Sequence, residues 1–361
     1  MLHTSRYIPA GRALMSAALA IALTASAAVA QQPAAASART ATHDAVTSSK
    51  IAPGLYEIVT STARNAVYVA SAGARGATGG SIFELDPNTL AIRSTIDMPD
   101  ERPLGLGLND RTQMLYTSNT HNGSVSAIDL RTGKVVATIS SPADTSAHVY
   151  RVLVDDQSNT VYVSIASTPG NVWVIDGNTN RIAHIIDSTG TRTTGLALDR
   201  GANRLYTASL GSNEITAIDL ATRKVVKTFP AGGERPTQLA FDDATNRLFI
   251  TNQGTDNMTV LDTETGELLA TVATGKQALG IGFDSKSQLV YVANRQAGTV
   301  SVIDAASYAI VSSLDAGSLP NTVAINPQSS VVYVTNKARN APRGQPATED
   351  PAGDTVTMIK P

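Results

Sequence analysis

Positively charged side chains recur at regular spacing through the middle of the sequence. The positions are Arg102, His148, Arg192 and Arg235, which follow one another at intervals of 46, 44 and 43 residues. A further interval of 42 residues reaches Gln277, with Lys276 beside it. Guanidinium groups pair bidentately with phosphate and carboxylate. If a repeated fold brings these positions together, the spacing predicts an arc of cations that recognises an anion.

More basic residues lie in segments that we expect to open on the same face. Arg151 falls where equivalent positions are Gly105 and Gly195, so we expect its side chain to point into a central channel. The expected loops add Arg75, His121, Arg295, Lys337, Arg339 and Arg343. The candidate anion-binding residues are Arg102, His148, Arg151, Arg192, Arg235, Lys276, Arg295, Lys337 and Arg339. Acidic neighbours dilute the charge, so the alternative is an ordinary solvated rim with local ion pairs.

The sequence lacks the residues that several other kinds of functional site require. The sequence has no cysteine, which excludes thiolate metal sites and cysteine nucleophiles. Its histidines show no metal-ligand spacing, and no P-loop, dinucleotide fingerprint or Gly-x-Ser-x-Gly elbow is present. We therefore expect no metal and no cofactor, and a binding protein rather than an enzyme.

An internal repeat must position the charged side chains, and one aromatic residue marks each copy. These anchors are Tyr68, Tyr116, Tyr162, Tyr206, Phe249, Tyr291 and Tyr333. Their separations fall from 48 to 42 residues along the chain. Seven copies at a near-constant period of this size indicate a repeat architecture.

Each copy has the pattern of four short strands. In the fourth copy we expect strands at 194–198, 204–209, 214–219 and 224–229. Seven such copies predict an all-β fold, a seven-bladed β-propeller of four-stranded antiparallel blades. The last copy supplies only three strands, so we expect an N-terminal strand near His43 to Ser48 to complete that blade and close the ring.

Two conspicuous residue types are interpreted as structural. An aspartate ends each expected third strand: Asp86, Asp129, Asp176, Asp219, Asp262 and Asp304. An aspartate in this position caps the backbone of a hairpin turn, and a ring of metal-binding carboxylates is the alternative. Trp173, the only tryptophan, is assigned to core packing rather than to base stacking.

The first residues have the features of an export signal. Arg6 and Arg12 precede an apolar stretch that ends in Ala28-Val29-Ala30. We predict a signal peptide at 1–30 that is cleaved after Ala30, a flexible leader at 31–45 and a single propeller domain at 46–361. Cleavage leaves a net charge of about −4, which counts against strong non-specific nucleic-acid binding. We expect a periplasmic monomer whose mature chain has no membrane span.

Three stretches carry a resemblance to a known family. They are Tyr333 to Asn336 (Tyr-Val-Thr-Asn), Val300 to Asp304 (Val-Ser-Val-Ile-Asp) and Pro320 to Ile325 (Pro-Asn-Thr-Val-Ala-Ile). The chain resembles the YVTN-repeat β-propellers, and within them the YncE-like periplasmic proteins, from about residue 50 onward. The resemblance implies the propeller fold and makes single-stranded nucleic acid, including single-stranded DNA, one candidate partner.

Three functions are therefore compatible with the sequence. The first is a non-enzymatic binding protein that uses a basic face at one channel mouth for an anionic partner. The second is a periplasmic protein-interaction scaffold, because propeller faces suit that role. The third is a lactonase- or lyase-like enzyme in which His148, Arg151, Arg192 and Glu57 supply acid–base and anion-binding groups.

Overall fold

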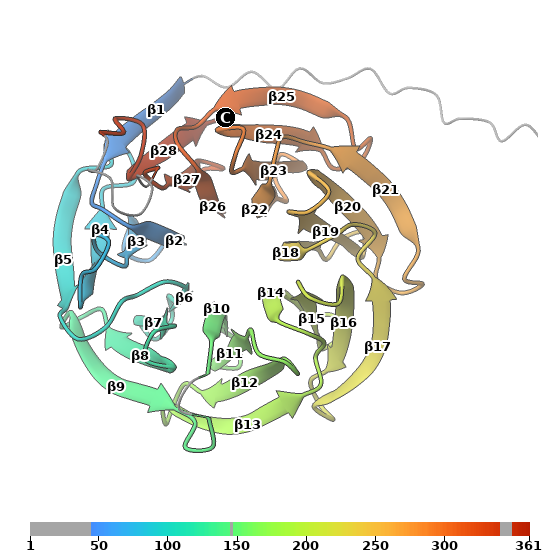
Figure 1. Cartoon of the computed structure of the whole chain (residues 1–361), viewed down its shortest axis with the longest axis horizontal. Coiled ribbons are helices and arrows are strands. Elements are labelled where there is room, and N and C mark those ends of the chain that lie inside the picture. The colour runs from blue at the N-terminus through green and yellow to red at the C-terminus, as the bar shows by residue number, and fades with distance from the viewer. Residues whose placement is uncertain (1–44, 145–146, 340–348) are drawn as a thin grey trace, which may run out of the picture. The chain divides into compact units, whose positions relative to one another are not determined.

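Seven four-stranded antiparallel sheets stand in a ring in the computed structural model of the chain, as predicted (Figure 1). The structure describes residues 45–144, 147–339 and 349–361. The predicted signal peptide and leader lie outside these residues, except for Ala45, which begins the first strand. The described part of the chain contains no helix that could cross a membrane.

The blades follow one another in chain order, each from its inner to its outer strand. Blade 1 contains β2 Leu55–Ser61, β3 Ala66–Ser71, β4 Gly80–Leu85 and β5 Ile92–Met98. Blade 2 contains β6 Leu106–Asn109, β7 Met114–Asn119, β8 Ser124–Asp129 and β9 Lys134–Ser140. Blade 3 contains β10 Val149–Asp155, β11 Thr160–Ile165, β12 Asn171–Asp176 and β13 Arg181–Asp187. Blade 4 contains β14 Thr193–Asp199, β15 Arg204–Ser209, β16 Glu214–Asp219 and β17 Lys224–Pro230. Blade 5 contains β18 Pro236–Asp242, β19 Arg247–Asn252, β20 Asn257–Asp262 and β21 Leu268–Ala273. Blade 6 contains β22 Ala278–Asp284, β23 Leu289–Asn294, β24 Thr299–Asp304 and β25 Ile310–Asp315. Blade 7 contains β26 Pro320–Ile325, β27 Val332–Asn336, β28 Thr355–Lys360 and, outermost, β1 Ala45–Lys50.

The ring is closed by the N-terminal strand of the described chain. β1 pairs antiparallel with β28 over six residues, from Ala45 opposite Lys360 to Lys50 opposite Thr355. The hydroxyl groups of Ser48 and Thr357 lie 2.8 Å apart across this pair. In Figure 1 the blue strand β1 lies along the red strand β28. The expected closure is confirmed, and it covers an edge of β28 that would otherwise be unpaired.

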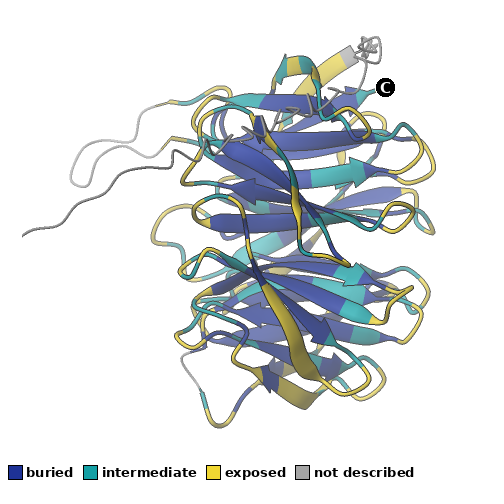
Figure 2. Ribbon diagram, turned by 90° about the vertical axis from the view of Figure 1, so that its right-hand side faces the viewer, coloured by how far each residue is buried: buried dark blue, intermediate teal, exposed yellow. Residues whose placement is uncertain are grey.

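The middle strands are buried on both faces because each blade is packed between two others. β27 is buried along its whole length, whereas outer strands such as β17 are mostly exposed. Figure 2 shows this as dark blue inner strands beneath yellow outer strands and loops. Val, Ile, Thr and Tyr suit such strands because branched and aromatic side chains pack well on a pleated surface.

The anchor aromatics pack between blades. Each of the seven rings is at most 6% exposed. The Tyr116 hydroxyl donates to Asn180 Oδ1 at 2.9 Å, and the Tyr333 hydroxyl donates to the carbonyl oxygen of Pro87 at 2.7 Å. Each hydroxyl therefore reaches an outer hairpin of the following blade, and the second contact joins blade 7 to blade 1.

The Ser or Thr that lies two residues after the anchor aromatic also joins neighbouring blades, as four copies of the repeat show. Its hydroxyl donates to the inner-strand carbonyl of the following blade: Ser118 to Tyr150 at 2.7 Å, Ser164 to Thr194 at 2.7 Å, Thr251 to Leu279 at 2.7 Å and Thr335 to Tyr56 at 2.6 Å. The asparagine that follows acts within its own blade. Asn336 Nδ2, for example, donates to the hydroxyls of Thr355 and Thr357 on the neighbouring strand.

The inner strands approach one another too closely for side chains at some positions. A Cβ atom on Gly105 would lie 2.4 Å from the carbonyl oxygen of Tyr150, and one on Gly195 would lie 2.7 Å from that of Thr237. The small residues of the inner strands therefore reflect crowding around the channel.

The structural interpretations of aspartate and tryptophan are also confirmed. Asp262 Oδ1 accepts from the backbone amides of Glu264 and Thr265, and the other strand-ending aspartates cap their hairpins in the same way. Trp173 is 1% exposed, so its ring is not available to stack on a base.

Removal of β1 tests the closure of the ring. We expect deletion of residues 31–50 to lower the thermal transition temperature and to promote aggregation, because β28 becomes an unpaired edge. Deletion of residues 31–44, which leaves β1 whole, is the matched control. Differential scanning calorimetry compares the two, and an equal transition temperature in both would contradict the role of β1.

The Thr251→Val substitution tests the bond between blades. It keeps the shape of the side chain but removes the donor to the Leu279 carbonyl, so we expect the free energy of unfolding to fall by about 1–2 kcal/mol. Thr271→Val is the control because Thr271 is exposed on β21. Urea titrations of both variants measure the difference, and equal stabilities would refute the proposed contribution of this bond.

Candidate anion-binding site

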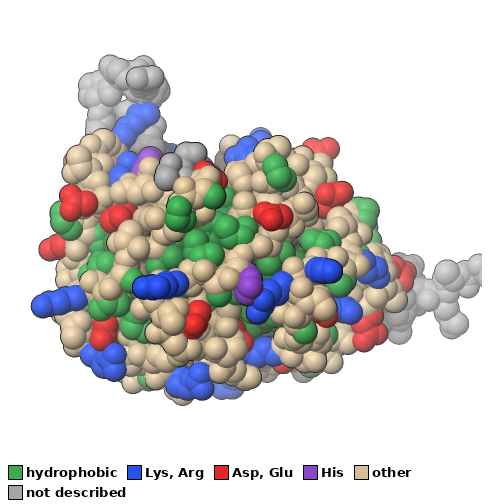
Figure 3. Space-filling view, turned by 90° about the horizontal axis from the view of Figure 1, so that it is seen from below, with side chains coloured by type: hydrophobic (Ala, Val, Ile, Leu, Met, Phe, Trp, Pro, Cys, Tyr) green, Lys and Arg blue, Asp and Glu red, His purple; other side chains and the backbone are tan. Residues whose placement is uncertain are grey.

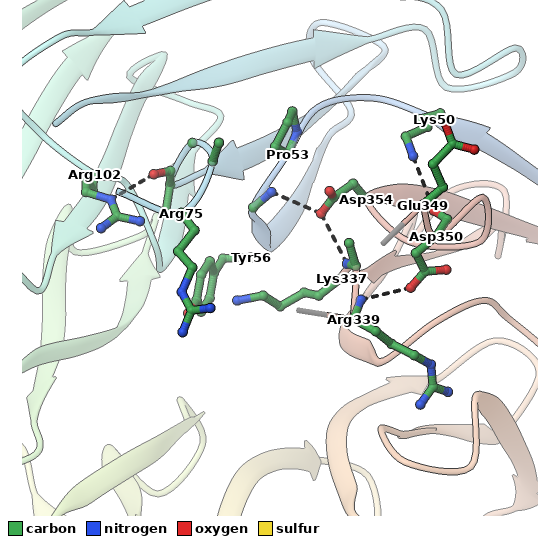
Figure 4. Close-up of a pocket in the computed structure, with 15 residues that line it drawn as sticks. Lys50, Pro53, Tyr56, Arg75, Arg102, Lys337, Arg339, Glu349, Asp350 and Asp354 are labelled. Atoms are coloured by element: carbon green, nitrogen blue, oxygen red, sulfur yellow. Dashed lines mark hydrogen bonds between the residues drawn. The ribbon is translucent and has the colours of Figure 1, made fainter. Parts of the chain in front are cut away.

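A cavity of about 430 Å³ lies at the seam between the first and last blades, which we call the seam cavity (Figure 4). The loop after β3 and the loop after β27 both line it, because closure of the ring makes blades 1 and 7 neighbours. The lining residues are Lys50, Pro53, Gly54, Tyr56, Ala72, Gly73, Ala74, Arg75, Arg102, Lys337, Ala338, Arg339, Glu349, Asp350 and Asp354. Among the predicted residues, the cavity brings together Arg102, Lys337 and Arg339.

Lys337 is the most unusual of these side chains. It follows β27 directly, and its Nζ lies over the Tyr56 ring, 3.2 Å from the ring centroid. Burial lowers the pKa of Lys337 to about 7, and the charges of Arg295 and Arg102 act in the same direction while Asp354 opposes them. The ring face also opposes the shift because it attracts the ammonium form. Lys337 can therefore gain or lose its proton near neutral pH.

Arg102 is held at the other side of the seam cavity by a backbone carbonyl and an imidazole ring. Its Nε donates to the carbonyl oxygen of Ala72 at 2.8 Å, and its Nη1 lies 3.2 Å from Nε2 of His121. Since neither contact is with a carboxylate, the guanidinium group keeps its positive charge uncompensated locally. Its fixed orientation reduces the conformational entropy that binding an anion would cost.

Three carboxylates line the seam cavity. Glu349 is exposed, and Asp350 and Asp354 accept hydrogen bonds from backbone amides. Asp354 Oδ1 accepts from Gly54 N at 3.0 Å and from Ala338 N at 3.2 Å. Asp350 accepts from Arg339 N at 2.8 Å and from the Ser318 hydroxyl at 2.7 Å. Figure 4 shows these bonds turned toward the loops, away from the tip of Lys337. The two acids therefore fix the shape of the site.

Four other candidate anion-binding residues lie outside the lining of the seam cavity: His148, Arg192, Arg235 and Lys276. His148 and Arg192 are exposed neighbours. Partial desolvation by the surrounding atoms lowers the pKa of His148, and the charges of Arg192 and His121 lower it further. Arg235 and Lys276 are exposed as well, before the inner strands of blades 5 and 6. Arg192 and Arg235 adopt positive φ angles of 58° and 54°, a conformation that side-chain-bearing residues adopt infrequently.

The last two predicted residues lie deeper, at the throat of the channel. Arg151 forms an ion pair with Glu57, which is 5% exposed, and Arg295 Nη1 donates to Asn321 Oδ1 at 2.6 Å. Burial raises the pKa of Glu57, although Arg151 opposes that shift. A small cavity of about 60 Å³ lies here, lined by Tyr56, Glu57, Arg151 and Gln238 among others.

Sequence reasoning missed Tyr56, and it named Glu57 beside Arg151 only as a candidate acid–base or anion-binding group, not as its ion-pair partner. Glu57 occupies the same position in its repeat as Arg151, eleven residues before the anchor aromatic, but this alignment does not show that the two side chains meet across the channel. Tyr56 lines both cavities, and only the closed ring shows that it faces Lys337.

The hairpins opposite the channel mouth carry several ion pairs. Arg64, Arg93, Arg131, Arg200 and Arg247 form them there, among the residues that the structure describes. In the residues that the structure covers, no carboxylate forms an ion pair with Arg102, Arg192, Arg235, Arg295 or Lys337. The outer wall of the ring carries positive and negative side chains interspersed (Figure 3). The described residues also contain no group of three or more potential metal ligands.

Comparison with known proteins agrees with this architecture. No family model matches the chain. It is 36% identical to the uncharacterized protein YncE of Salmonella typhi and 35% identical to that of Escherichia coli (strain K12), in each case over 173 residues. These alignments cover 46% of this chain and 49% of each relative, so the chain spans about half the length of the curated relatives it matches.

Two solved structures share the fold at low sequence identity. Kuenenia stuttgartiensis hydrazine synthase has a TM-score of 0.68 and 16% identity, over 79% of this chain and 93% of that chain. The Cps50 (Swd1) β-propeller domain of Myceliophteria thermophila has a TM-score of 0.67 and 10% identity, over 88% and 99%. At these identities the likeness shows the fold alone. The ring of seven four-stranded blades is that of a β-propeller, and over 173 residues the chain is similar to the YncE proteins.

Proposed function

We propose that this chain is an exported, non-enzymatic binding protein that holds an anionic partner at the channel mouth, with single-stranded nucleic acid as the favoured partner. One observation carries the proposal: Arg102 and Lys337, which line the seam cavity, form no ion pair with a carboxylate in the described structure, while five arginines at the opposite hairpins, Arg64, Arg93, Arg131, Arg200 and Arg247, do. A cationic side chain that has no carboxylate partner can form strong charge-assisted hydrogen bonds with a bound anion.

The shape and composition of the mouth favour a backbone-binding mode. Arg102, Lys337 and Arg339 lie around one cavity, and Arg192 continues the positive charge along the rim beside His148. A single strand of nucleic acid presents a phosphate at every nucleotide and can follow such a curve. Tyr56 is the single aromatic residue in the lining of the seam cavity, so base stacking contributes little and affinity depends strongly on salt.

A protein-interaction scaffold is the second candidate, and the outer strands favour it. Val136 on β9 and Val226 on β17 are 53% and 52% exposed. Apolar side chains on unpaired outer strands suit contact with another protein. The periplasm is the proposed compartment of both candidates, on the strength of the predicted signal peptide.

Arg102→Ala tests the anion site. We expect it to weaken binding of a fluorescently labelled oligothymidylate by about fivefold to thirtyfold and to reduce the salt slope, because one charge-assisted contact to phosphate is lost. Arg131→Ala, which removes an exposed arginine paired with Asp129 at the opposite hairpins, is the matched control. Fluorescence anisotropy at low and high salt measures both, and equal affinities of the two variants would contradict the site.

A double variant, Arg192→Ala with Arg235→Ala, tests whether binding extends along the arc. A further loss of affinity supports an extended contact along the rim. Unchanged affinity limits the site to the seam cavity.

The pH dependence of binding tests the contribution of Lys337. Because its pKa is about 7, the ammonium form predominates below that pH and is lost above it. We therefore expect oligothymidylate affinity to fall as pH rises from about 6 to about 8. Lys337→Gln should remove this part of the pH dependence, since groups such as His148 remain in both proteins. An identical pH profile for the variant and the parent would rule out this role.

A further inference from the structure

We propose that Lys337 is a nucleophilic amine that captures a small aldehyde or ketone bearing an anionic group, as a reversible Schiff base inside the seam cavity. The inference rests on the proposed anion site, because the surrounding cations would hold the charged end of the ligand. It adds a covalent step and a class of small molecules to that site.

The placement of the amine supports this chemistry. Lys337 is half-buried, and in the described part of the chain its Nζ contacts the Tyr56 ring and forms no ion pair with a carboxylate. Figure 4 shows Lys337 and Arg75 approaching Tyr56 from two sides of the seam cavity. The volume of about 430 Å³ accommodates a small organic molecule. The nitrogen atom is therefore accessible to a ligand and is not occupied by a salt bridge.

The charges around Lys337 favour its reactive form. Burial acts against the ammonium form, the charges of Arg295 and Arg102 add to this effect, and the pKa of Lys337 is lowered to about 7. Asp354 opposes them, but its Oδ1 is occupied by the amides of Gly54 and Ala338. A desolvated lysine beside other cations is a recognised form of activated amine. About half of the Lys337 side chains then carry a neutral nitrogen at pH 7.

The arginines supply the complementary part of the site. Their guanidinium groups stay protonated throughout the physiological range, so they cannot act as the nucleophile but can pair with carboxylate or phosphate. Arg102 is oriented by Ala72 and His121, and Arg339 lines the same cavity. An anion held by these groups would keep a carbonyl on the same molecule close to Nζ, which raises its effective concentration.

The covalent step is balanced and involves no oxidation or reduction. The lone pair of neutral Nζ attacks the carbonyl carbon, the C–N bond forms, and the carbonyl oxygen takes up a proton to give a carbinolamine. The nitrogen then loses a proton, and a second proton on the hydroxyl group lets the C–O bond break, so that the oxygen leaves as water while the nitrogen lone pair forms the C=N bond. The resulting iminium ion loses the remaining nitrogen proton to give an imine, and hydrolysis returns the amine and the carbonyl compound.

Lys50 provides an internal comparison for the experiment. It lines the same cavity, but it is exposed, and its Nζ donates to the carbonyl oxygen of Asp350 at 3.3 Å. Both amines therefore meet the same reagent concentration, and they differ in burial and in nearby charge.

Reductive trapping tests the proposal on the mature protein. Glyoxylate carries an aldehyde beside a carboxylate, and cyanoborohydride supplies the hydride that converts its imine into a stable carboxymethyl adduct. At pH 7 we expect peptide mass spectrometry to show modification of Lys337 about tenfold faster than that of Lys50. Propanal, an uncharged aldehyde, should lose most of this preference. Arg102→Ala should reduce the preference for glyoxylate, and Lys337→Arg should remove the adduct.

Two results would overturn the inference. One is modification of Lys337 by glyoxylate no faster than that of Lys50, and the other is an equal preference of Lys337 for propanal. The pH profile of trapping in the unmodified protein provides a measurement that needs no variant: the rate should rise with a midpoint near pH 7, and a profile without that midpoint counts against an activated amine. Oligothymidylate titration of the same preparation reports on the proposed anion site separately, so the two proposals can fail independently.

Discussion

The contact between blade 7 and blade 1 is the interaction on which the rest of the structure depends. Every blade buries both faces against neighbours, so the ring is stable only if the last blade packs on the first. Thr335 donates to the Tyr56 carbonyl across this seam. Lys337, two residues further on, covers the ring of the same tyrosine. The hydrogen bond from Thr335 to Tyr56 thus also helps to position Lys337, whose pKa is lowered to about 7.

Much of the fold could be predicted from the sequence because its determinants are local and periodic. The spacing from Tyr68 to Tyr333 indicated seven blades, and a missing strand in the last copy indicated closure by the N-terminal segment. The site was predictable only in part. Arg102 and Lys337 were identified by charge and loop position, whereas Tyr56 and the Glu57–Arg151 pair depend on which side chains meet across the channel. Repeat spacing does not encode such contacts.

Charged side chains have different partners at the hairpins and at the channel mouth. At the hairpins, aspartates accept from turn amides, and several also pair with an arginine close by in the chain, as Asp129 does with Arg131. At the mouth, Asp350 and Asp354 accept from loop amides, and Lys337 and Arg102 form no ion pair with a carboxylate in the described structure. Lys337 loses its proton more readily as a result of burial and this surrounding positive charge. The copies of the repeat therefore differ from one another at the channel mouth, where Arg102 and Lys337 have no ion-paired carboxylate in the described structure.

The pairing of β1 with β28 also determines when the protein can finish folding. Ser48 and Thr357 are 309 residues apart, yet they lie side by side in the final sheet. Contacts of such high contact order form late and slowly, because the loop-closure entropy must be overcome before they contribute stability. A ribosome would release β1 long before its partner strand exists. Blades built from consecutive strands can form during that interval, but an intact seam, and with it the site, arises only after synthesis has reached β28.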